Sequence, residues 1–158
     1  AEAEKIYAQI IAANPRHFFA QLAATRYVLI RFYSVESLEE RRNRFLELEP
    51  LAENLIRPSI RSHFHNLMGD LAARYDVPLE RSLYHYRESV VAGIQNFRIR
   101  RDVLVSIGEI ARELGNVPFA VEFYERFLRE FPRDRRRILI QERLTALKAF
   151  ETMGSIVR

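Results

Sequence analysis

The side chains best suited to bind a metal are four histidines, and their spacing argues against a shared site. His63 and His65 are two positions apart, which on a helix turns their rings about 200° away from each other. His17 and His85 are isolated in the sequence. A zinc site needs three or four ligands that converge on one point. We therefore expect no metal site in this chain.

Catalytic motifs are also missing from the sequence. It contains no glycine-rich phosphate loop, no serine nucleophile elbow and no His-Glu-x-x-His motif. The absence of cysteine excludes disulfides, thiolate metal sites and cysteine nucleophiles. Acidic pairs such as Glu39-Glu40 lie among arginines, which is typical of solvated, ion-paired helix surfaces. The sequence thus predicts a protein that is not an enzyme and that binds no cofactor.

Arginine dominates the charge of the chain and suggests a different chemistry. Lysine and arginine together number 25, of which only Lys5 and Lys148 are lysine, and the net charge is +4. Arginines cluster at residues 41–44, 98–101 and 133–137. If these clusters lay on one face of the molecule, they would attract a phosphate backbone or an acidic protein. Acidic residues dilute the clusters, so a nucleic-acid-associated helical repeat is the alternative interpretation and not the preferred one.

The elements that must carry these side chains are helices throughout. Apolar residues recur every three or four positions, and no stretch alternates as a half-buried strand would. No run of 18 apolar residues occurs, so we expect no membrane insertion, and the compartment stays open. The periodicity predicts helices at about residues 2–13, 17–33, 36–48, 51–57, 60–75, 79–93, 98–114, 117–131 and 135–152.

Capping residues, prolines and glycines mark the ends of these helices, and two glycines lie in helix interiors. Ser34, with acidic residues shortly after it, predicts a helix N-cap. Gly115 suits the left-handed position after a helix, and Pro118 suits the first turn of the next one. Gly69 and Gly108 lie within helices, where glycine costs about 1 kcal/mol relative to alanine. We expect a neighbouring helix to pass too close to each of them for a side chain.

The sequence repeats itself with a period of 39 residues, the distance between Gly69 and Gly108. Alanine, tyrosine and proline occur twice with the same spacing, and the two occurrences are three such periods apart. The copies are Ala3, Tyr7 and Pro15, and Ala120, Tyr124 and Pro132. A repeat of this length predicts a stack of helical hairpins, each of which buries its apolar face on the next.

Residues 101–134 resemble a tetratricopeptide (TPR) repeat. The resemblance rests on Leu104, Ile107, Gly108, Ala111, Gly115, Ala120, Tyr124 and Pro132, which follow the spacing of the family pattern. It implies an all-α, right-handed superhelix of stacked antiparallel helical hairpins with a C-terminal capping helix. It implies a single domain over residues 1–158, with the second helix of a truncated repeat at 1–15, repeats at 17–57, 60–95 and 98–132, and the capping helix at 134–152.

Proteins of this family bind partner segments in a concave groove that the first helix of each hairpin lines. The resemblance therefore implies a non-catalytic scaffold that binds a peptide or helix of a partner protein, as part of a larger protein or assembly. The groove would be apolar at its N-terminal end and of mixed charge farther along. Its implied peptide-binding residues are Arg26, His63, Asn66, Asp70, Arg74, Asp102, Val105, Glu109, Arg112 and Glu113.

Two further expectations concern partners. The N-terminal helix has an apolar edge formed by Ile6, Tyr7, Ile10 and Ile11. This edge favours a homo-oligomer through that helix or an upstream helix of a longer protein. Charge reversal at Glu109 and Arg112 is expected to weaken partner binding without unfolding the chain.

Overall fold

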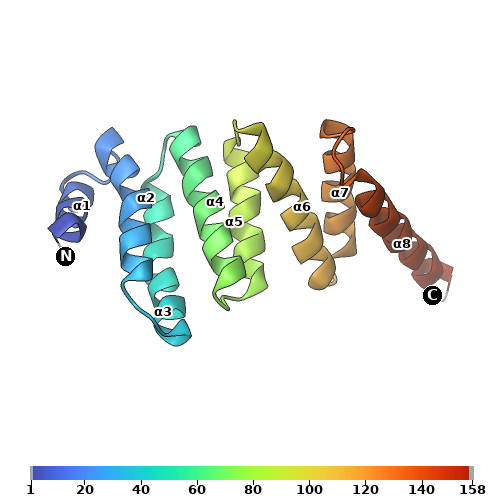
Figure 1. Ribbon diagram of the computed structural model, residues 1–158, viewed down its shortest axis with the longest axis horizontal. Helices are drawn as coiled ribbons and strands as arrows, with labels where there is room; N and C mark the ends of the chain where they lie inside the picture. The colour runs from blue at the N-terminus through green and yellow to red at the C-terminus, as the bar shows by residue number, and fades with distance from the viewer. Residues whose placement is uncertain (1, 157–158) are drawn as a thin grey trace. The chain divides into compact units, whose positions relative to one another are not determined.

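The computed structural model describes the backbone of residues 2–156 and the side chains of residues 2–149. Over this range the chain is all α and contains no strand, which confirms the predicted class. Apart from the segment at residues 51–57, the predicted helix ranges agree with the observed ones to within a few residues. The elements are α1 (Glu2–Ala13), α2 (Phe18–Tyr33), α3 (Leu38–Leu48), the 3-10 helix η1 (Glu49–Asn54), α4 (Pro58–Arg74), α5 (Leu79–Ala92), α6 (Phe97–Glu113), α7 (Val117–Glu130) and α8 (Arg137–Ile156) (Figure 1).

The segment at residues 51–57, predicted as a separate helix, has a different structure. α3 continues directly into η1, whose first turn contains Pro50. Proline has no backbone N–H, so the α-helical hydrogen-bond pattern cannot continue through it. The chain leaves this short helix at Leu55, whose backbone is extended. The segment is therefore a tight connection between α3 and α4.

The helices form two compact units, the N-terminal unit (residues 1–95) and the C-terminal unit (residues 96–158). In the N-terminal unit α2 packs against α1, α3 and α4, and α4 packs along α5. Its core includes Phe32, Phe45, Phe64 and Met68, all fully buried. Each such side chain contributes roughly 1.5–3 kcal/mol to the fold on burial.

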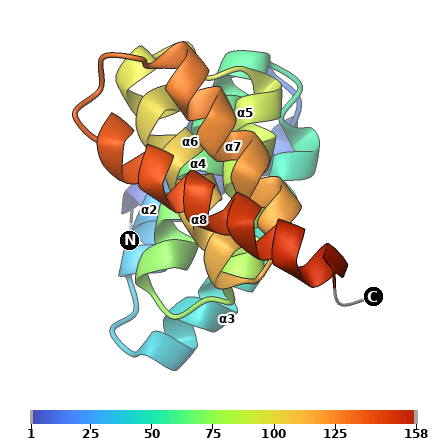
Figure 2. The same cartoon turned by 90° about the vertical axis from the view of Figure 1, so that its right-hand side faces the viewer.

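In the C-terminal unit α6 packs along α7, and α8 lies against α7 (Figure 2). Tyr124 and Phe127 of α7 are fully buried. α8 buries Ile140, Leu144 and Leu147, which are spaced by four and three residues and so form one apolar face of the helix. This periodicity explains why α8 packs on the unit with one side only.

The helix ends follow the sequence signals with one correction. Ser37, not Ser34, is the N-cap of α3: its Oγ accepts the Glu40 N–H at 3.1 Å and donates to the Glu40 carboxylate at 2.9 Å. The Glu40 carboxylate accepts the Ser37 hydroxyl and so supports this cap, whereas residue 37 itself occupies the corresponding position for Ser34. Gly115 has a φ of 72°, and Pro118 lies in the first turn of α7, as predicted.

Gly69 and Gly108 lie where a tyrosine of the following helix leaves no room for a side chain. A Cβ atom on Gly69 would be 2.6 Å from the Tyr86 ring, and one on Gly108 would meet the Tyr124 ring in the same way. Real Cβ atoms do not approach other atoms this closely. The structure confirms the close helix approach that the two glycines predict.

The same two tyrosines are held by hydrogen bonds to the acidic residue that follows each glycine. The Tyr86 hydroxyl donates to Asp70 at 2.7 Å, and the Tyr124 hydroxyl donates to Glu109 at 2.6 Å. Both bonds join the first helix of a hairpin to its second helix. The α4–α5 and α6–α7 hairpins therefore share one packing arrangement.

Replacing Gly108 by alanine is expected to lower the free energy of unfolding by about 1–2 kcal/mol. Overpacking against the Tyr124 ring costs more than the roughly 1 kcal/mol that alanine gains in helix propensity. The ring cannot easily move aside because it is fully buried and its hydroxyl is bonded. Urea denaturation measures the change. Gly69→Ala is the parallel test against Tyr86, and stabilisation by either substitution would contradict the packing described.

Candidate functional site

An exposed apolar stripe runs along α2. Phe19, Leu22 and Leu29 are spaced by three and seven residues, which places them on one face of the helix. Their exposed fractions are 63%, 42% and 38%. Arg26 lies between the two leucines on the same face and is also exposed. This predicted site residue is thus flanked by apolar side chains that face solvent.

A groove of about 560 Å³ lies between α2 and α4 of the N-terminal unit. It brings together two of the predicted site residues, Arg26 and His63. Leucine and isoleucine side chains form much of its wall, and no acidic residue lines it. The lining residues are Leu22, Thr25, Arg26 and Leu29 of α2 and Ser59, Ile60 and His63 of α4.

A buried glutamine holds the start of α4 beside α2. The Gln21 side chain is 1% exposed. Its Oε1 accepts the N–H groups of Ile56 and Arg57 at 3.0 Å each, and its Nε2 donates to the Arg16 carbonyl at 2.6 Å. The groove wall depends on this residue because Ile56 and Arg57 lead directly into α4. No sequence pattern marks Gln21, since one polar residue on a helix does not reveal what lies opposite.

The other three predicted residues of α4 do not line this groove. Asn66 and Asp70 are half-buried, and Arg74 is exposed. Asp70 accepts the Tyr86 hydroxyl. Burial and this hydrogen bond raise the pKa of Tyr86, so the phenol stays protonated and donates. Asp70 therefore stabilises the α4–α5 hairpin.

In the C-terminal unit the predicted residues of α6 form ion pairs with one another and with the start of α8. Asp102 pairs with Arg136, just before α8, at 2.9 Å. Glu109 pairs with Arg143 of α8 and, at 3.2 Å, with Arg112 of its own helix. Asp102 and Glu109 are seven residues apart, and so are their partners Arg136 and Arg143. Two parallel ion pairs therefore connect α6 with the start of α8. These charges are already engaged within the unit.

Because of these contacts, a charge reversal at Glu109 would test more than partner binding. A cation there would lie beside Arg143 and would remove the acceptor of the Tyr124 hydroxyl. Burial and the Glu109 hydrogen bond raise the pKa of Tyr124 to about 12, so the hydroxyl donates at neutral pH. Val105 is half-buried and Glu113 is exposed. Because reversal at Glu109 would disturb packing as well as partner contacts, α2 offers the cleaner surface for a binding test.

In each of the three sequence clusters, some of the arginines are paired with acidic residues. Arg100 forms two hydrogen bonds with Glu130, at 2.6 and 2.9 Å, and these lower the pKa of Glu130 to about 2. Arg136 pairs with Asp134 at 3.0 Å. Arg42 of the first cluster likewise pairs with an acidic residue of the N-terminal unit. A cation that is already paired gains less from a phosphate backbone.

A buried histidine pair, unexpected from the sequence, lies in the N-terminal unit. The Nδ1 atoms of His65 and His85 are 2.9 Å apart, and the His85 Nε2 is 3.1 Å from the Glu49 carboxylate. Because the carboxylate accepts, the proton of His85 is on Nε2, and the free His85 Nδ1 accepts from the Nδ1–H of His65. Arg81 bonds the same carboxylate at 2.9 Å. The spacing of the two histidines in sequence gives no sign of this tertiary contact.

Burial keeps both imidazoles neutral. It lowers the pKa of each of His65 and His85 to about 4. The His65 Nε2 is buried without a hydrogen-bond partner, as fits the lone pair of a neutral ring. His63 is exposed, so the two rings of this segment diverge as predicted. Among the described residues, no group of three histidine, aspartate or glutamate side chains is placed to hold a metal ion.

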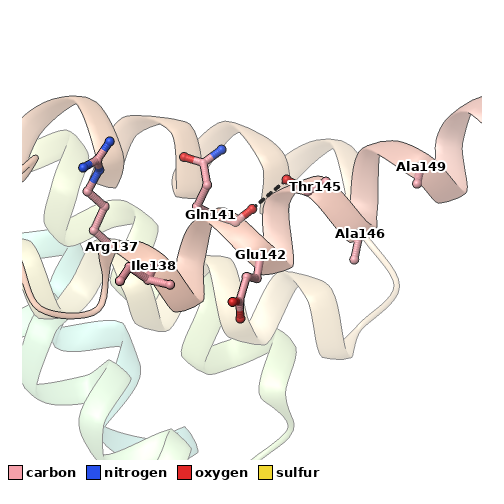
Figure 3. A pocket seen from close by; sticks show the side chains of 7 residues that line it. All are labelled: Arg137, Ile138, Gln141, Glu142, Thr145, Ala146 and Ala149. Carbon is pink, nitrogen blue, oxygen red and sulfur yellow. Dashed lines mark hydrogen bonds between the residues drawn. The ribbon is translucent and has the colours of Figure 1, made fainter.

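The first and last helices also expose apolar residues. Ile6 and Ile10 of α1 are 47% and 37% exposed, and Ile138 of α8 is 72% exposed. A hollow of about 620 Å³ lies along α8, and all the side chains that line it belong to this one helix (Figure 3). These are Arg137, Ile138, Gln141, Glu142, Thr145, Ala146 and Ala149. Nothing in the described part of the chain shows what covers either helix.

Comparison of the chain with protein-family models, with curated proteins and with solved structures found no match. The resemblance to tetratricopeptide repeats therefore stays a prediction. Among the residues that the structure describes, no helix is both long enough and apolar enough to cross a membrane. The groove between α2 and α4 is the candidate site on its geometry alone.

Proposed function

We propose that this chain is a non-catalytic, tetratricopeptide-like scaffold that binds a segment of a partner protein in the groove between α2 and α4. The observation that carries the proposal is the exposed stripe of Phe19, Leu22 and Leu29. The opposite face of α2 buries Val28 and Phe32, so the helix already has a complete core face without the stripe. Contiguous apolar patches on soluble proteins mark interaction surfaces.

The groove suits a protein segment because it combines apolar walls with few polar groups. A partner side chain that fills such a wall contributes roughly 1.5–3 kcal/mol on burial. The exposed Arg26 and His63 would fix the orientation of the segment by hydrogen bonds or charge. This division of roles is usual in grooves that bind a peptide or an amphipathic helix.

The tetratricopeptide-like superhelix is part of the same proposal. It is supported by the contact that the α4–α5 and α6–α7 hairpins share, between a glycine and a tyrosine 17 or 16 residues later. Helices stacked with this regularity form extended surfaces for partners. Nucleic-acid binding receives less support, because arginines of all three clusters pair with acidic residues.

Replacing Leu22 and Leu29 together by aspartate is expected to reduce partner capture at least about tenfold, because two apolar anchors are lost. The measurement is an affinity pull-down from lysate of the source organism, with and without nuclease treatment. Val91→Asp on α5 is the matched control, since Val91 is 71% exposed and lies outside the groove. Equal capture by all three proteins would place the partner elsewhere. If nuclease treatment abolishes the capture of partners, the result would favour the nucleic-acid alternative.

A further inference from the structure

We propose that the groove between α2 and α4 selects a partner segment that carries an acidic residue between two apolar anchors. This inference rests on the proposed function and adds the chemistry of the ligand. It follows from the order of three residues along α2: Leu22, Arg26 and Leu29. The groove thus presents apolar, cationic and apolar contacts in sequence.

The cation in the groove has no acidic partner of its own. Among the described residues no carboxylate lies within ion-pair distance of Arg26, and no acidic residue lines the groove. Arg31, one turn and a half farther along α2, instead pairs with Glu4 of α1 at 2.8 Å. Arg26 thus differs from many arginines of this chain in lacking an internal partner, and a carboxylate from outside can supply one.

The surroundings of Arg26 strengthen this preference. His63, across the groove, is the only other ionisable side chain among the lining residues, and it carries either no charge or a positive one. The groove also faces the first turn of α4 through Ser59 and Ile60, and the partial positive charge of a helix N-terminus adds to the potential. An acidic segment is attracted by Arg26 and by this helix end, whereas a basic segment is repelled by them.

The spacing of the apolar contacts limits the ligand further. Leu22 and Leu29 are seven residues apart on one helix, which separates them by about 10 Å. Anchors with this separation are residues i and i+7 of a helix or residues i and i+3 of an extended segment. Arg26 lies between the leucines, so the acidic residue belongs between the anchors. A phosphate backbone has the charge but lacks the apolar anchors, which argues for a protein segment.

The test is selection from a random 16-residue peptide library displayed on phage. The wild type is compared with a Leu22→Asp, Leu29→Asp variant that blocks the groove, and peptides enriched on the wild type alone are sequenced. We expect aspartate and glutamate to exceed lysine and arginine between their apolar positions. Circular dichroism and thermal melting confirm that each variant is folded.

Synthetic peptides then test Arg26 itself. Arg26→Glu is expected to weaken the binding of an acidic groove peptide, measured by fluorescence anisotropy, about tenfold or more. The affinity for the same peptide with glutamine in place of the acidic residue is expected to change less than about twofold. Arg129→Glu, an exposed arginine on α7, is the matched control and is expected to leave both affinities unchanged.

The outcomes separate the two proposals. Groove-dependent peptides without an acidic bias, or equal effects of Arg26→Glu on both peptides, would overturn the inference about the ligand and leave the proposed function standing. Enrichment of the same peptides on the wild type and the blocked variant, or no enrichment at all, would overturn both.

Discussion

Lowering the pH from 6.5 to 4 is expected to reduce the free energy of unfolding by several kcal/mol, roughly 3 kcal/mol for each of His65 and His85. In the folded chain burial holds the pKa of both rings near 4, whereas the unfolded chain takes up their protons below the ordinary value of 6.5. Nearby Arg61 and Arg81 add to the effect of burial. The unfolded state thus binds more protons throughout this window, so stability falls as the pH falls.

Urea denaturation at a series of pH values measures this effect, because the slope of stability against pH gives the protons taken up on unfolding. His65→Leu removes one of the two groups and is expected to reduce the uptake near pH 5 by about one proton. Phe64→Leu is the control, since it weakens the core without removing a titrating group and so keeps the wild-type slope. If His65→Leu leaves the slope of stability against pH unchanged, the histidine pair is not the source of the pH dependence.

Gln21→Leu is expected to lower the free energy of unfolding by roughly 2–4 kcal/mol. The substitution keeps the volume of the side chain but leaves the N–H groups of Ile56 and Arg57 without their acceptor. An unsatisfied buried donor costs about 1–3 kcal/mol, and these two are partly buried. The loss is expected to be larger than the hydrophobic gain from leucine.

The measurement is again urea denaturation, with Gln141→Leu as the matched control. Gln141 is exposed on α8, so the same change of residue there is expected to alter stability by less than about 0.5 kcal/mol. Equal effects at both positions would contradict a structural role for the Gln21 hydrogen bonds. Since Gln21 positions the start of α4, weaker peptide binding in the groove is expected to accompany the loss of stability.

The sequence predicts helices well here because their signals are local. The period of apolar residues and the left-handed Gly115 both act within one or two turns of the chain. The predicted cap, Ser34, lies three residues before the observed one because the sequence 34–37 contains two serines. Only the glutamate three residues after Ser37 decides between them.

The site was harder to predict because it depends on contacts between distant residues. Arg26 and His63 line the same groove, and their role in binding a partner segment stays a prediction. Asp70 and Glu109 were assigned to partner binding, yet each accepts a tyrosine hydroxyl of its own hairpin. The position of a residue on a helix face is readable from spacing. Whether its charge is free depends on which side chains the neighbouring helix brings to it.

The tyrosine contacts also bear on how the protein forms during synthesis. The bonds from Tyr86 to Asp70 and from Tyr124 to Glu109 close loops of only 16 and 15 residues. Short loops cost little entropy to close, and chains rich in such local contacts fold fast. The α4–α5 hairpin can therefore close soon after Tyr86 leaves the ribosome, before α6 has emerged.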